Sequence, residues 1–275
     1  MRWRDQRQST NIEDRRGMGG RGMALGGGGI GVLILAAIVC LLGGDPRQFL
    51  DGSGSVPDVQ APSTVSNSAK PPDENRQFVS VVMASTEDAW KQILLQQARR
   101  NYQAPKLVLY SGQTSTACGY GQAAMGPFYC PGDQNLYLDF DFFRELKQEF
   151  KADGDFAQAY VIAHEVGHHV QNLLGTMAKV QRAGQNNQLS VALELQADCY
   201  AGVWANFAQK KGIVEAGDTD EALRAASAVG DDMIQRRTQG YVVPESFTHG
   251  SADQRQKAFA IGMKFGDMRQ CEVFK

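Results

Sequence analysis

The chain has 275 residues, with 28 Lys and Arg against 30 Asp and Glu, and a formal net charge of −2. This near balance gives a pI of about 6.1 and argues against a nucleic-acid-binding protein. Hydrophobic residues make up 43% of the chain, which is enough for the core of one large domain or two small ones.

The N-terminal part of the chain has the pattern of a membrane anchor. Residues 1–22 carry six arginines and almost no large apolar side chain, so we expect them to be disordered. Residues 23–44 hold no charge and are long enough to span a bilayer as a helix. The arginine excess before them predicts a cytoplasmic N-terminus. A cleaved signal peptide is the alternative, but no small-x-small site follows Leu42, which favours an uncleaved anchor.

Residues 45–75 are rich in Gly, Ser, Pro and Asp, a composition typical of a flexible linker. The folded domain is therefore expected over residues 76–275, on the far side of the membrane. Short apolar runs mixed with helical periodicities predict an α+β domain with few strands and several helices. Strands are expected at 107–110 and 136–143, and helices at 88–100, 156–175, 190–208, 220–237 and 251–264. Residues 136–143 fit either an edge strand that binds an extended substrate or a core strand.

Four cysteines lie beyond the anchor, at positions 118, 130, 199 and 271. An even set in an exported domain indicates disulfides, and four cysteines allow three connectivities. Cys118 with Cys130 is the local choice, and it leaves Cys199 with Cys271. Buried free thiols are the alternative. A metal role is disfavoured because none of these cysteines has C-x-x-C spacing.

Residues 164–168 read His-Glu-Val-Gly-His within an apolar, helix-compatible run. Positions four apart share one face of a helix, so His164 and His168 can bind one metal ion. Glu165 lies beside the first histidine, where it could take a proton from a water on the metal. Zinc peptidases use this set of two ligands and a base. The pentad also occurs by chance, but three of the four histidines of the chain lie in this run.

A catalytic zinc site needs a third protein ligand and keeps its fourth position for water. Glu194 is the candidate, on the predicted helix 190–208. Asp198 follows one turn later, where it could accept a hydrogen bond from the non-ligating nitrogen of a zinc-bound histidine and fix its tautomer. The alternative for both is a solvated helix face, although apolar residues flank them closely.

The two other histidines have less defined roles. His169 lies about 100° around the helix from His168, so it cannot share the same ion, and we interpret it either as structural or as a partner behind a metal ligand. His249 lies at a loop-helix junction, from which it could donate a hydrogen bond to the oxyanion of a tetrahedral intermediate. An exposed loop histidine is an equally good interpretation of His249 from spacing alone. Gly167 indicates either close approach of another backbone or simple tolerance within a helix.

These residues resemble the neutral zinc metallopeptidase family of bacterial membrane-anchored proteins. The runs that carry the resemblance are 163–170, 193–198 and 248–251, with further matches at 116–119, 126–131 and 136–140. It implies a zincin-like fold, in which two histidines and a glutamate bind zinc. By position, His164, His168 and Glu194 match the ligands, Glu165 the base and Asp198 the aspartate that orients a histidine, with His249 suggested as a transition-state donor.

The resulting hypothesis is a single-pass protein of a bacterial inner membrane with a periplasmic or other extracytoplasmic domain. That domain would hydrolyse peptide bonds, with Zn²⁺ as its cofactor, Glu165 as the general base and a peptide or protein as its substrate. The alternative is a zinc-stabilised, membrane-tethered binding or assembly factor with little turnover. A third possibility is a structural membrane protein in which the HExxH motif is incidental.

Overall fold

The computed structural model describes residues 1–17, 73–122, 126–184 and 186–274. The ranges Met1–Arg15 and Asp73–Lys275 form one compact unit. The predicted membrane span, 23–44, and nearly all of the predicted linker, 45–75, lie outside the described residues. Among the helices that are described, none has the length and apolar character needed to cross a bilayer.

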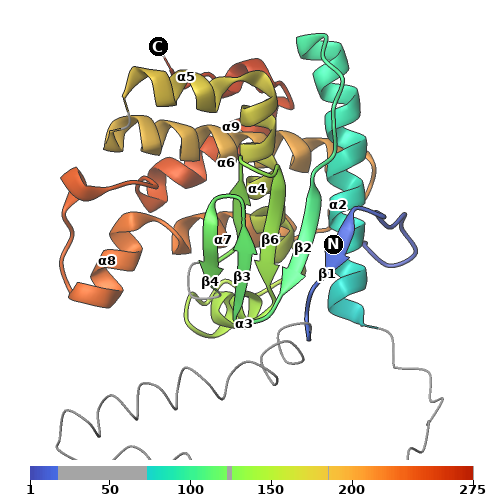
Figure 1. Ribbon diagram of the computed structural model, residues 1–275, viewed down its shortest axis with the longest axis horizontal. Coiled ribbons are helices and arrows are strands. Elements are labelled where there is room, and N and C mark those ends of the chain that lie inside the picture. Colours follow the sequence, from blue (N-terminus) through green and yellow to red (C-terminus); the bar gives the residue numbers. More distant parts are fainter. Residues whose placement is uncertain (18–72, 123–125, 185, 275) are drawn as a thin grey trace, which may run out of the picture. The chain divides into compact units, whose positions relative to one another are not determined.

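A four-stranded mixed sheet lies at the centre of this unit (Figure 1), in the order β1-β2-β6-β5. Its strands are β1 (Ile12–Asp14), β2 (Lys106–Tyr110), β6 (Asn135–Asp139) and β5 (Phe128–Cys130). The pairs β1–β2 and β2–β6 are parallel, whereas β5 runs antiparallel to β6. The strand predicted at 107–110 is thereby confirmed, and β5 is an antiparallel edge strand.

The strand predicted at 136–143 is shorter than expected and lies inside the sheet. It ends as β6 at Asp139, and its last four residues are buried. Since β6 pairs with β2 on one side and β5 on the other, its interpretation as a substrate-binding edge is wrong. A separate hairpin, β3 (Gln113–Thr116) with β4 (Gly119–Gln122), packs on the sheet. There the Phe128 ring lies so close to Gly121 that a Cβ at this position would clash with it.

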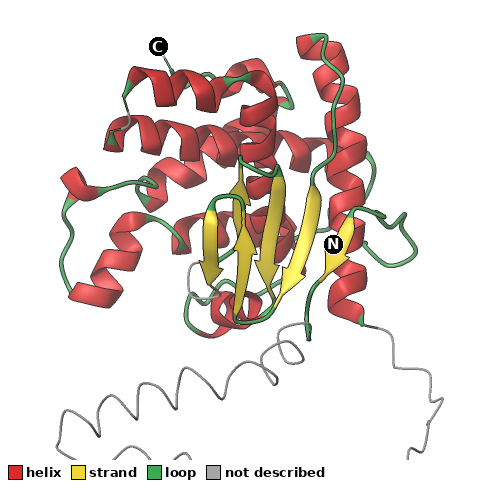
Figure 2. Cartoon of the chain, in the orientation of Figure 1, coloured by secondary structure: helices red, strands yellow, loops and turns green. Residues whose placement is uncertain are grey.

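Helices cover the sheet and make up most of the unit (Figure 2). They are α2 (Glu74–Ile93), α3 (Asp141–Gln148), α4 (Asp155–Leu174), α5 (Thr176–Ala183), α6 (Asn187–Lys210), α7 (Asp218–Ala228), α8 (Asp231–Gln239) and α9 (Ala252–Phe265). Shorter helical turns are η2 (Leu94–Ala98), η4 (Pro244–Ser246) and η5 (Met268–Cys271). The α+β class is confirmed, as are the helices that we predicted at 156–175, 190–208 and 251–264.

Two helices differ from prediction. The helix expected at 88–100 begins earlier, because α2 starts at Glu74 behind an Asp73 N-cap and includes the apolar, β-branched run 77–83. That run is almost wholly buried. The single helix expected at 220–237 is divided into α7 and α8 at Val229 and Gly230, where a Cβ on the glycine would lie 2.4 Å from the backbone nitrogen of Ala252.

Helix α4 lies at the centre of the helical layer and packs against α2, α6 and α7. A Cβ at Gly167 would lie 2.9 Å from the carbonyl oxygen of Ala197 on α6. The glycine is therefore explained by close approach of another backbone, one of the two readings its position allowed. Helices α6 and α9 approach even more closely at Gly202 and Gly262. These contacts fix α4, α6 and α9, the three helices that surround the candidate site.

Both expected disulfides are present, Cys118–Cys130 and Cys199–Cys271. The first joins the turn of the β3–β4 hairpin to the end of β5. The second joins α6 to η5, in the C-terminal tail that follows α9 (residues 267–274). Each disulfide thus holds a peripheral segment against an element next to the candidate site.

The expectation of disorder across residues 1–22 is wrong for residues 1–15. The Trp3 ring packs edge-on against Phe78 of α2, 5.5 Å between centroids, and β1 adds a strand to the sheet. The Arg7 guanidinium donates to the buried carboxylate of Glu87 at 3.1 Å. The arginine-rich composition suggested a solvated tail, but several of its charges have partners 80 or more residues away, which composition does not reveal.

This packing bears on membrane topology. Strand β1 and the rest of the folded unit must lie on the same side of any membrane, because β1 hydrogen-bonds with β2. The predicted arrangement, with the N-terminus in the cytoplasm and the domain across the bilayer, is incompatible with that pairing. The two disulfides agree with an oxidising compartment for the folded unit.

Candidate metal centre

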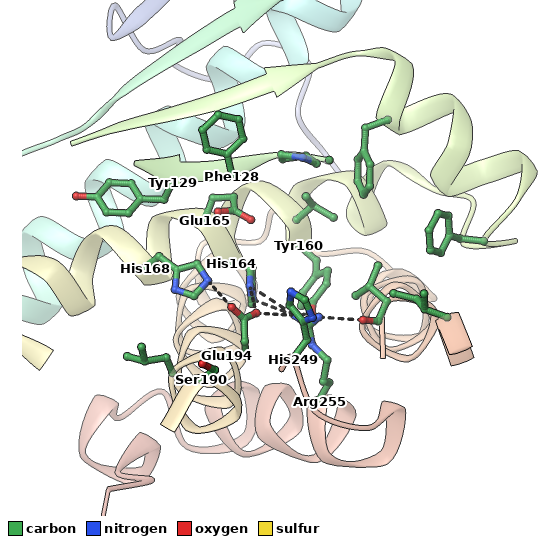
Figure 3. Close-up of a pocket in the computed structure, with 18 of the residues that line it drawn as sticks. Phe128, Tyr129, Tyr160, His164, Glu165, His168, Ser190, Glu194, His249 and Arg255 are labelled. Atoms are coloured by element: carbon green, nitrogen blue, oxygen red, sulfur yellow. Dashed lines mark hydrogen bonds and ion pairs between the residues drawn. The ribbon is translucent and has the colours of Figure 1, made fainter. Parts of the chain in front are cut away.

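The helical spacing predicted for His164 and His168 brings their rings together on α4, with centroids 4.8 Å apart. Glu194 approaches both from α6 (Figure 3). Its carboxylate oxygens lie 3.2 Å from His164 Nε2 and 3.3 Å from His168 Nε2. The three side chains thus place two nitrogens and a carboxylate around one point, all within 4.8 Å of one another.

These separations fit a tetrahedral zinc ion. Nitrogen and oxygen ligands bind zinc at about 2.0–2.1 Å, and two corners of such a tetrahedron lie about 3.3–3.4 Å apart. The nitrogen–oxygen distances, 3.2 Å from His164 to one oxygen of Glu194 and 3.3 Å from His168 to the other, are each close to that edge length. Two histidines and one glutamate are also a donor set of catalytic zinc sites. The sequence-predicted ligands therefore suit zinc in their chemistry, and they lie close enough together to share one ion.

Asp198 lies behind His164, as its position one turn after Glu194 predicted. Its carboxylate is fully buried and lies 2.8 Å from His164 Nδ1. The hydroxyl of Tyr160 donates to the same carboxylate. The Asp198 carboxylate, which accepts a hydrogen bond from Nδ1, keeps a proton of His164 on that nitrogen and leaves Nε2 for the metal.

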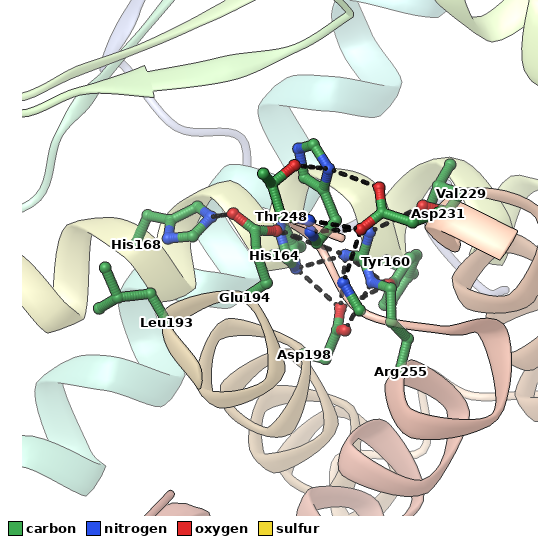
Figure 4. A network of polar contacts seen from close by, with 12 residues as sticks. Tyr160, His164, His168, Leu193, Glu194, Asp198, Val229, Asp231, Thr248 and Arg255 are labelled. Atoms are coloured by element: carbon green, nitrogen blue, oxygen red, sulfur yellow. Dashed lines mark hydrogen bonds and ion pairs between the residues drawn. The ribbon is translucent and has the colours of Figure 1, made fainter. Parts of the chain in front are cut away.

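Arg255 is a member of this cluster that the sequence analysis missed. The side chain lies on α9, is 5% exposed, and donates from Nε to Asp198 at 2.8 Å and from Nη2 at 3.0 Å (Figure 4). The sequence pattern of α9 could have indicated this role. Arg255 occupies the stripe of the helix whose other buried members are small or apolar: Ala252, Ala258, Phe259 and Gly262. A charge on such a stripe requires a buried partner.

The charges of the cluster are arranged in pairs. Burial opposes the charged form of His164, but Asp198 outweighs it and raises the pKa of His164 to about 10. Burial likewise opposes the charge of His168, and Glu194 raises its pKa. The pKa of Glu194 lies well below its ordinary value, because the two imidazoles outweigh its burial. A metal ion at this point would therefore replace protons on the two histidines.

Glu165, the predicted base, lines the cleft beside the two histidines. Glu165 is 8% exposed. Within the described part of the chain, its carboxylate has no hydrogen bond or ion pair. Burial raises the pKa of Glu165, although the two neighbouring histidines oppose the rise. A buried carboxylate that faces a cleft without a protein partner is placed to exchange a proton with a molecule in that cleft.

The last predicted residue, His249, also lines the cleft, just before α9. Its Nδ1 lies 3.0 Å from a carboxylate oxygen of Asp231, the first residue of α8. Asp231 also accepts the backbone N–H groups of Thr248, His249 and Gly250, which fixes the loop. The hydrogen bond between the His249 side chain and Asp231 raises the pKa of His249, against the effect of burial. Asp231 was not identified from the sequence, because nothing local connects it with His249.

His169 points away from the metal centre, as its position around the helix predicted. Its Nε2 donates to the carbonyl of Gln103 at 2.6 Å, so Nδ1 accepts from the Tyr129 hydroxyl at 3.1 Å. Asn172 of α4 donates to the same hydroxyl at 2.9 Å. Tyr129 belongs to β5, and therefore two residues of α4 hold the edge strand in place.

The cleft above these residues has a volume of about 660 Å³. The edge strand β5 contributes Phe128 and Tyr129 to its wall, opposite Glu194 and Ser190 (Figure 3). Apolar side chains form much of the remaining lining: Phe142, Phe150, Val161, Met177, Leu193, Val229 and Ile234. This volume lies within the usual range of ligand-binding clefts, about 300–1,000 Å³, and the cleft offers apolar surface beside the predicted base.

Several known proteins are similar to this chain. The uncharacterized protein YpfJ of Escherichia coli (strain K12) is 49% identical over 288 aligned positions, covering 100% of this chain and 99% of the relative. The uncharacterized proteins Mb2605 of Mycobacterium bovis and Rv2575 of Mycobacterium tuberculosis are 45% identical over 217 positions, 74% of this chain and 72% of each relative. No solved structure gives a match. The family described as "Putative neutral zinc metallopeptidase" matches residues 1–274, and the chain belongs to that family.

Proposed function

We propose that the chain is a zinc-dependent peptidase with its centre at His164, His168 and Glu194. The observation that carries this proposal is the convergence of these three side chains, whose ligand atoms lie within 4.8 Å of one another, with the unpaired carboxylate of Glu165 beside them in a cleft. Family membership supports zinc as the metal and a peptide or protein as the substrate.

When bound, zinc supplies a Lewis acid that activates water and polarises a carbonyl group. Glu165 takes a proton from the water and passes it to the leaving amine, which its raised pKa favours. His249 donates a hydrogen bond to the oxygen on which negative charge develops. Because His249 Nδ1 faces Asp231, the donor must be Nε2, and therefore the imidazole acts in its protonated form.

The edge strand β5 is the surface on which an extended peptide would bind. In the described part of the chain β5 pairs only with β6, so its other edge has no strand partner. A peptide added there would run along the cleft wall formed by Phe128 and Tyr129. The apolar lining favours substrates with a large apolar side chain next to the cleaved bond.

The location of the protein is also part of the proposal. Disulfides at Cys118–Cys130 and Cys199–Cys271 support an extracytoplasmic folded unit. The apolar composition of residues 23–44 still predicts attachment to a bacterial membrane, but not by a single crossing, which would separate β1 from β2. Residues 1–15 lie on the same side as the folded unit, since β1 belongs to its sheet.

Glu165→Gln tests the mechanism in the full chain, because a fragment that starts at residue 76 would lack β1. We expect this variant to bind zinc with one ion per chain and to lose at least about 10²-fold in the rate of casein cleavage, the scale of a general base. Metal content and digestion are measured with and without a chelator. Full turnover by the variant would remove Glu165 from the mechanism.

The same measurements separate the alternative function. Zinc bound stoichiometrically, with no cleavage of casein or of a mixed peptide library by the wild-type chain, would favour a zinc-stabilised binding or assembly factor. A purified chain that binds no zinc would overturn both proposals and leave the HExxH motif incidental.

A further inference from the structure

The second histidine, His168, also has a partner behind it, although the sequence analysis assigned none. Its Nδ1 lies 2.9 Å from Oε1 of Gln171, one turn further along α4. Gln171 is completely buried and does not line the cleft. Its amide is therefore available to the back of the histidine and not to a substrate.

The orientation of the Gln171 amide follows from its second partner. Nε2 of Gln171 lies 2.7 Å from the backbone carbonyl of Leu193, which can only accept a hydrogen bond. The nitrogen must therefore face Leu193, and the oxygen must face His168. An amide oxygen accepts, so the proton of His168 lies on Nδ1, and Nε2 faces Glu194 and the proposed ion.

The chain of amides continues to the C-terminal tail. Gln171 Nε2 also donates to Oε1 of Gln196 at 3.1 Å, and Nε2 of Gln196 donates to the carbonyl of Cys271 at 3.1 Å. Gln196 is 3% exposed. Cys271 is held to α6 by its disulfide with Cys199, which fixes this last acceptor. Each amide nitrogen thus has a backbone carbonyl among its acceptors, which gives each amide a single consistent orientation.

We propose that Gln171 is a positioning residue for the metal centre, and that Gln196 and the disulfide-bonded tail hold it in place. In this arrangement the tail acts through the side chains of Gln196 and Gln171 to fix the tautomer and ring orientation of His168. The inference rests on the zinc site of the proposed function, but not on peptide hydrolysis. A purely structural role for the two amides would leave the affinity for the metal unchanged.

Substitution of each amide by Met, which is similar in size but cannot accept in the same way, tests the proposal in the full chain. Zinc affinity is measured by competition with a chelator, and the Co²⁺-loaded protein is examined by its visible absorption. We expect Gln171→Met to bind zinc about 10–100-fold more weakly and to change the Co²⁺ spectrum, the usual effect of losing such a partner. Gln196→Met should weaken zinc binding less, because His168 keeps its direct acceptor.

Gln256→Met is the matched control. Gln256 on α9 also donates to a leucine carbonyl, that of Leu223 at 2.9 Å, but it has no link to His168. We expect wild-type zinc affinity and an unchanged Co²⁺ spectrum in this variant. Wild-type affinity in Gln171→Met would overturn the inference while leaving the zinc site intact, whereas absence of zinc from the wild type would instead overturn the proposed function.

If Gln171→Met does not fold, a variant of the C-terminal tail tests the inference instead. The double variant Cys199→Ala with Cys271→Ala releases the acceptor of Gln196 without touching α4. Weaker zinc binding by this variant, relative to Gln256→Met, supports the inference, and unchanged binding contradicts it. The melting temperature of the zinc-free proteins is measured alongside, so that a loss of fold is not mistaken for a loss of affinity.

Discussion

The two histidines of the metal centre are supported in physically different ways. His164 faces a charged group, the buried Asp198 carboxylate, which is itself paired with Arg255. His168 faces a neutral amide, Gln171, whose partners are another amide and a backbone carbonyl. One helix therefore presents two proposed ligands of the same type, one held by an ion pair and the other by a chain of amides.

Because of this difference, substitutions on the two sides should affect the stability of the protein and its metal affinity to different extents. A buried ion pair contributes little net stability while both partners are present, but removing one leaves an uncompensated charge. A neutral amide that loses its partner leaves only an unsatisfied polar group, which costs less. The His164 side should therefore be sensitive to substitution even without metal, whereas the His168 side should show its role mainly when metal is bound.

Arg255→Leu should give the largest effect on the zinc-free protein. It leaves Asp198 buried with His164 as its main charged partner, and we expect a loss of about 3–5 kcal/mol in the free energy of unfolding. Urea denaturation in the presence of a chelator measures it. Adding Asp198→Asn to the same chain should restore part of the loss, because the uncompensated charge is then removed.

Gln171→Met provides the comparison for that experiment. Its expected loss under the same zinc-free conditions is about 1–3 kcal/mol, the cost of unsatisfied buried polar groups. Equal losses for Arg255→Leu and Gln171→Met would show that the charged and neutral supports do not differ in the way their chemistry suggests.

The third supported histidine, His249, extends the comparison to the surface. It too has a carboxylate partner, Asp231, but its side chain is 52% exposed, so solvent screens the pair and its effect should appear in activity more than in stability. Asp231→Asn removes the interaction that raises the pKa of His249. Because protonated His249 is the proposed donor, activity should fall as pH rises through this pKa. In Asp231→Asn the fall should begin at a lower pH.

A profile of kcat/KM against pH checks this expectation, with Asp232→Asn as the control. Asp232 lies next to Asp231 in α8 but accepts only from the backbone of Ala252 among its described hydrogen bonds, and should leave the alkaline limb in place. An unchanged alkaline limb in Asp231→Asn would mean that His249 does not act as a protonated donor.

The contrast between these supports also explains what the sequence could reveal. His164, Glu165 and His168 are related by helical spacing, and Glu194 and Asp198 by the same spacing on another helix, so each set is visible locally. Arg255, Gln171 and Asp231 acquire their meaning from contacts with side chains or loops brought together by the fold. Gln171 is only three residues from His168, yet its orientation is decided by Leu193, on a different helix.

The sheet likewise shows what local sequence patterns cannot predict. Residues 107–110 and the core of 136–143 have strand composition and were recognisable, but which strand lies at the edge depends on pairing. Strand β1 pairs with residues more than 90 positions away, and its arginine-rich surroundings gave no periodic signal. The antiparallel edge strand β5 is only three residues long and follows Gly126 and Pro127, so no pattern marked it in advance.

The smallest expected effect concerns the neighbouring histidine, His169, whose neutral support serves the edge strand and not the metal. Burial lowers the pKa of His169 and raises that of Tyr129 to about 12, so the tyrosine remains the donor and the imidazole the acceptor. Tyr129→Phe removes this bond and the one from Asn172, which should cost about 1 kcal/mol in the free energy of unfolding.

Zinc affinity should be unchanged in Tyr129→Phe, in contrast to Gln171→Met, while KM for a peptide substrate should rise because β5 is held less firmly against α4. Chelator competition and steady-state kinetics on the same preparation measure the two quantities. A fall in zinc affinity comparable to that of Gln171→Met would show that the face of α4 bearing His169 is coupled to the metal, and that adjacent histidines on this helix are not functionally separate.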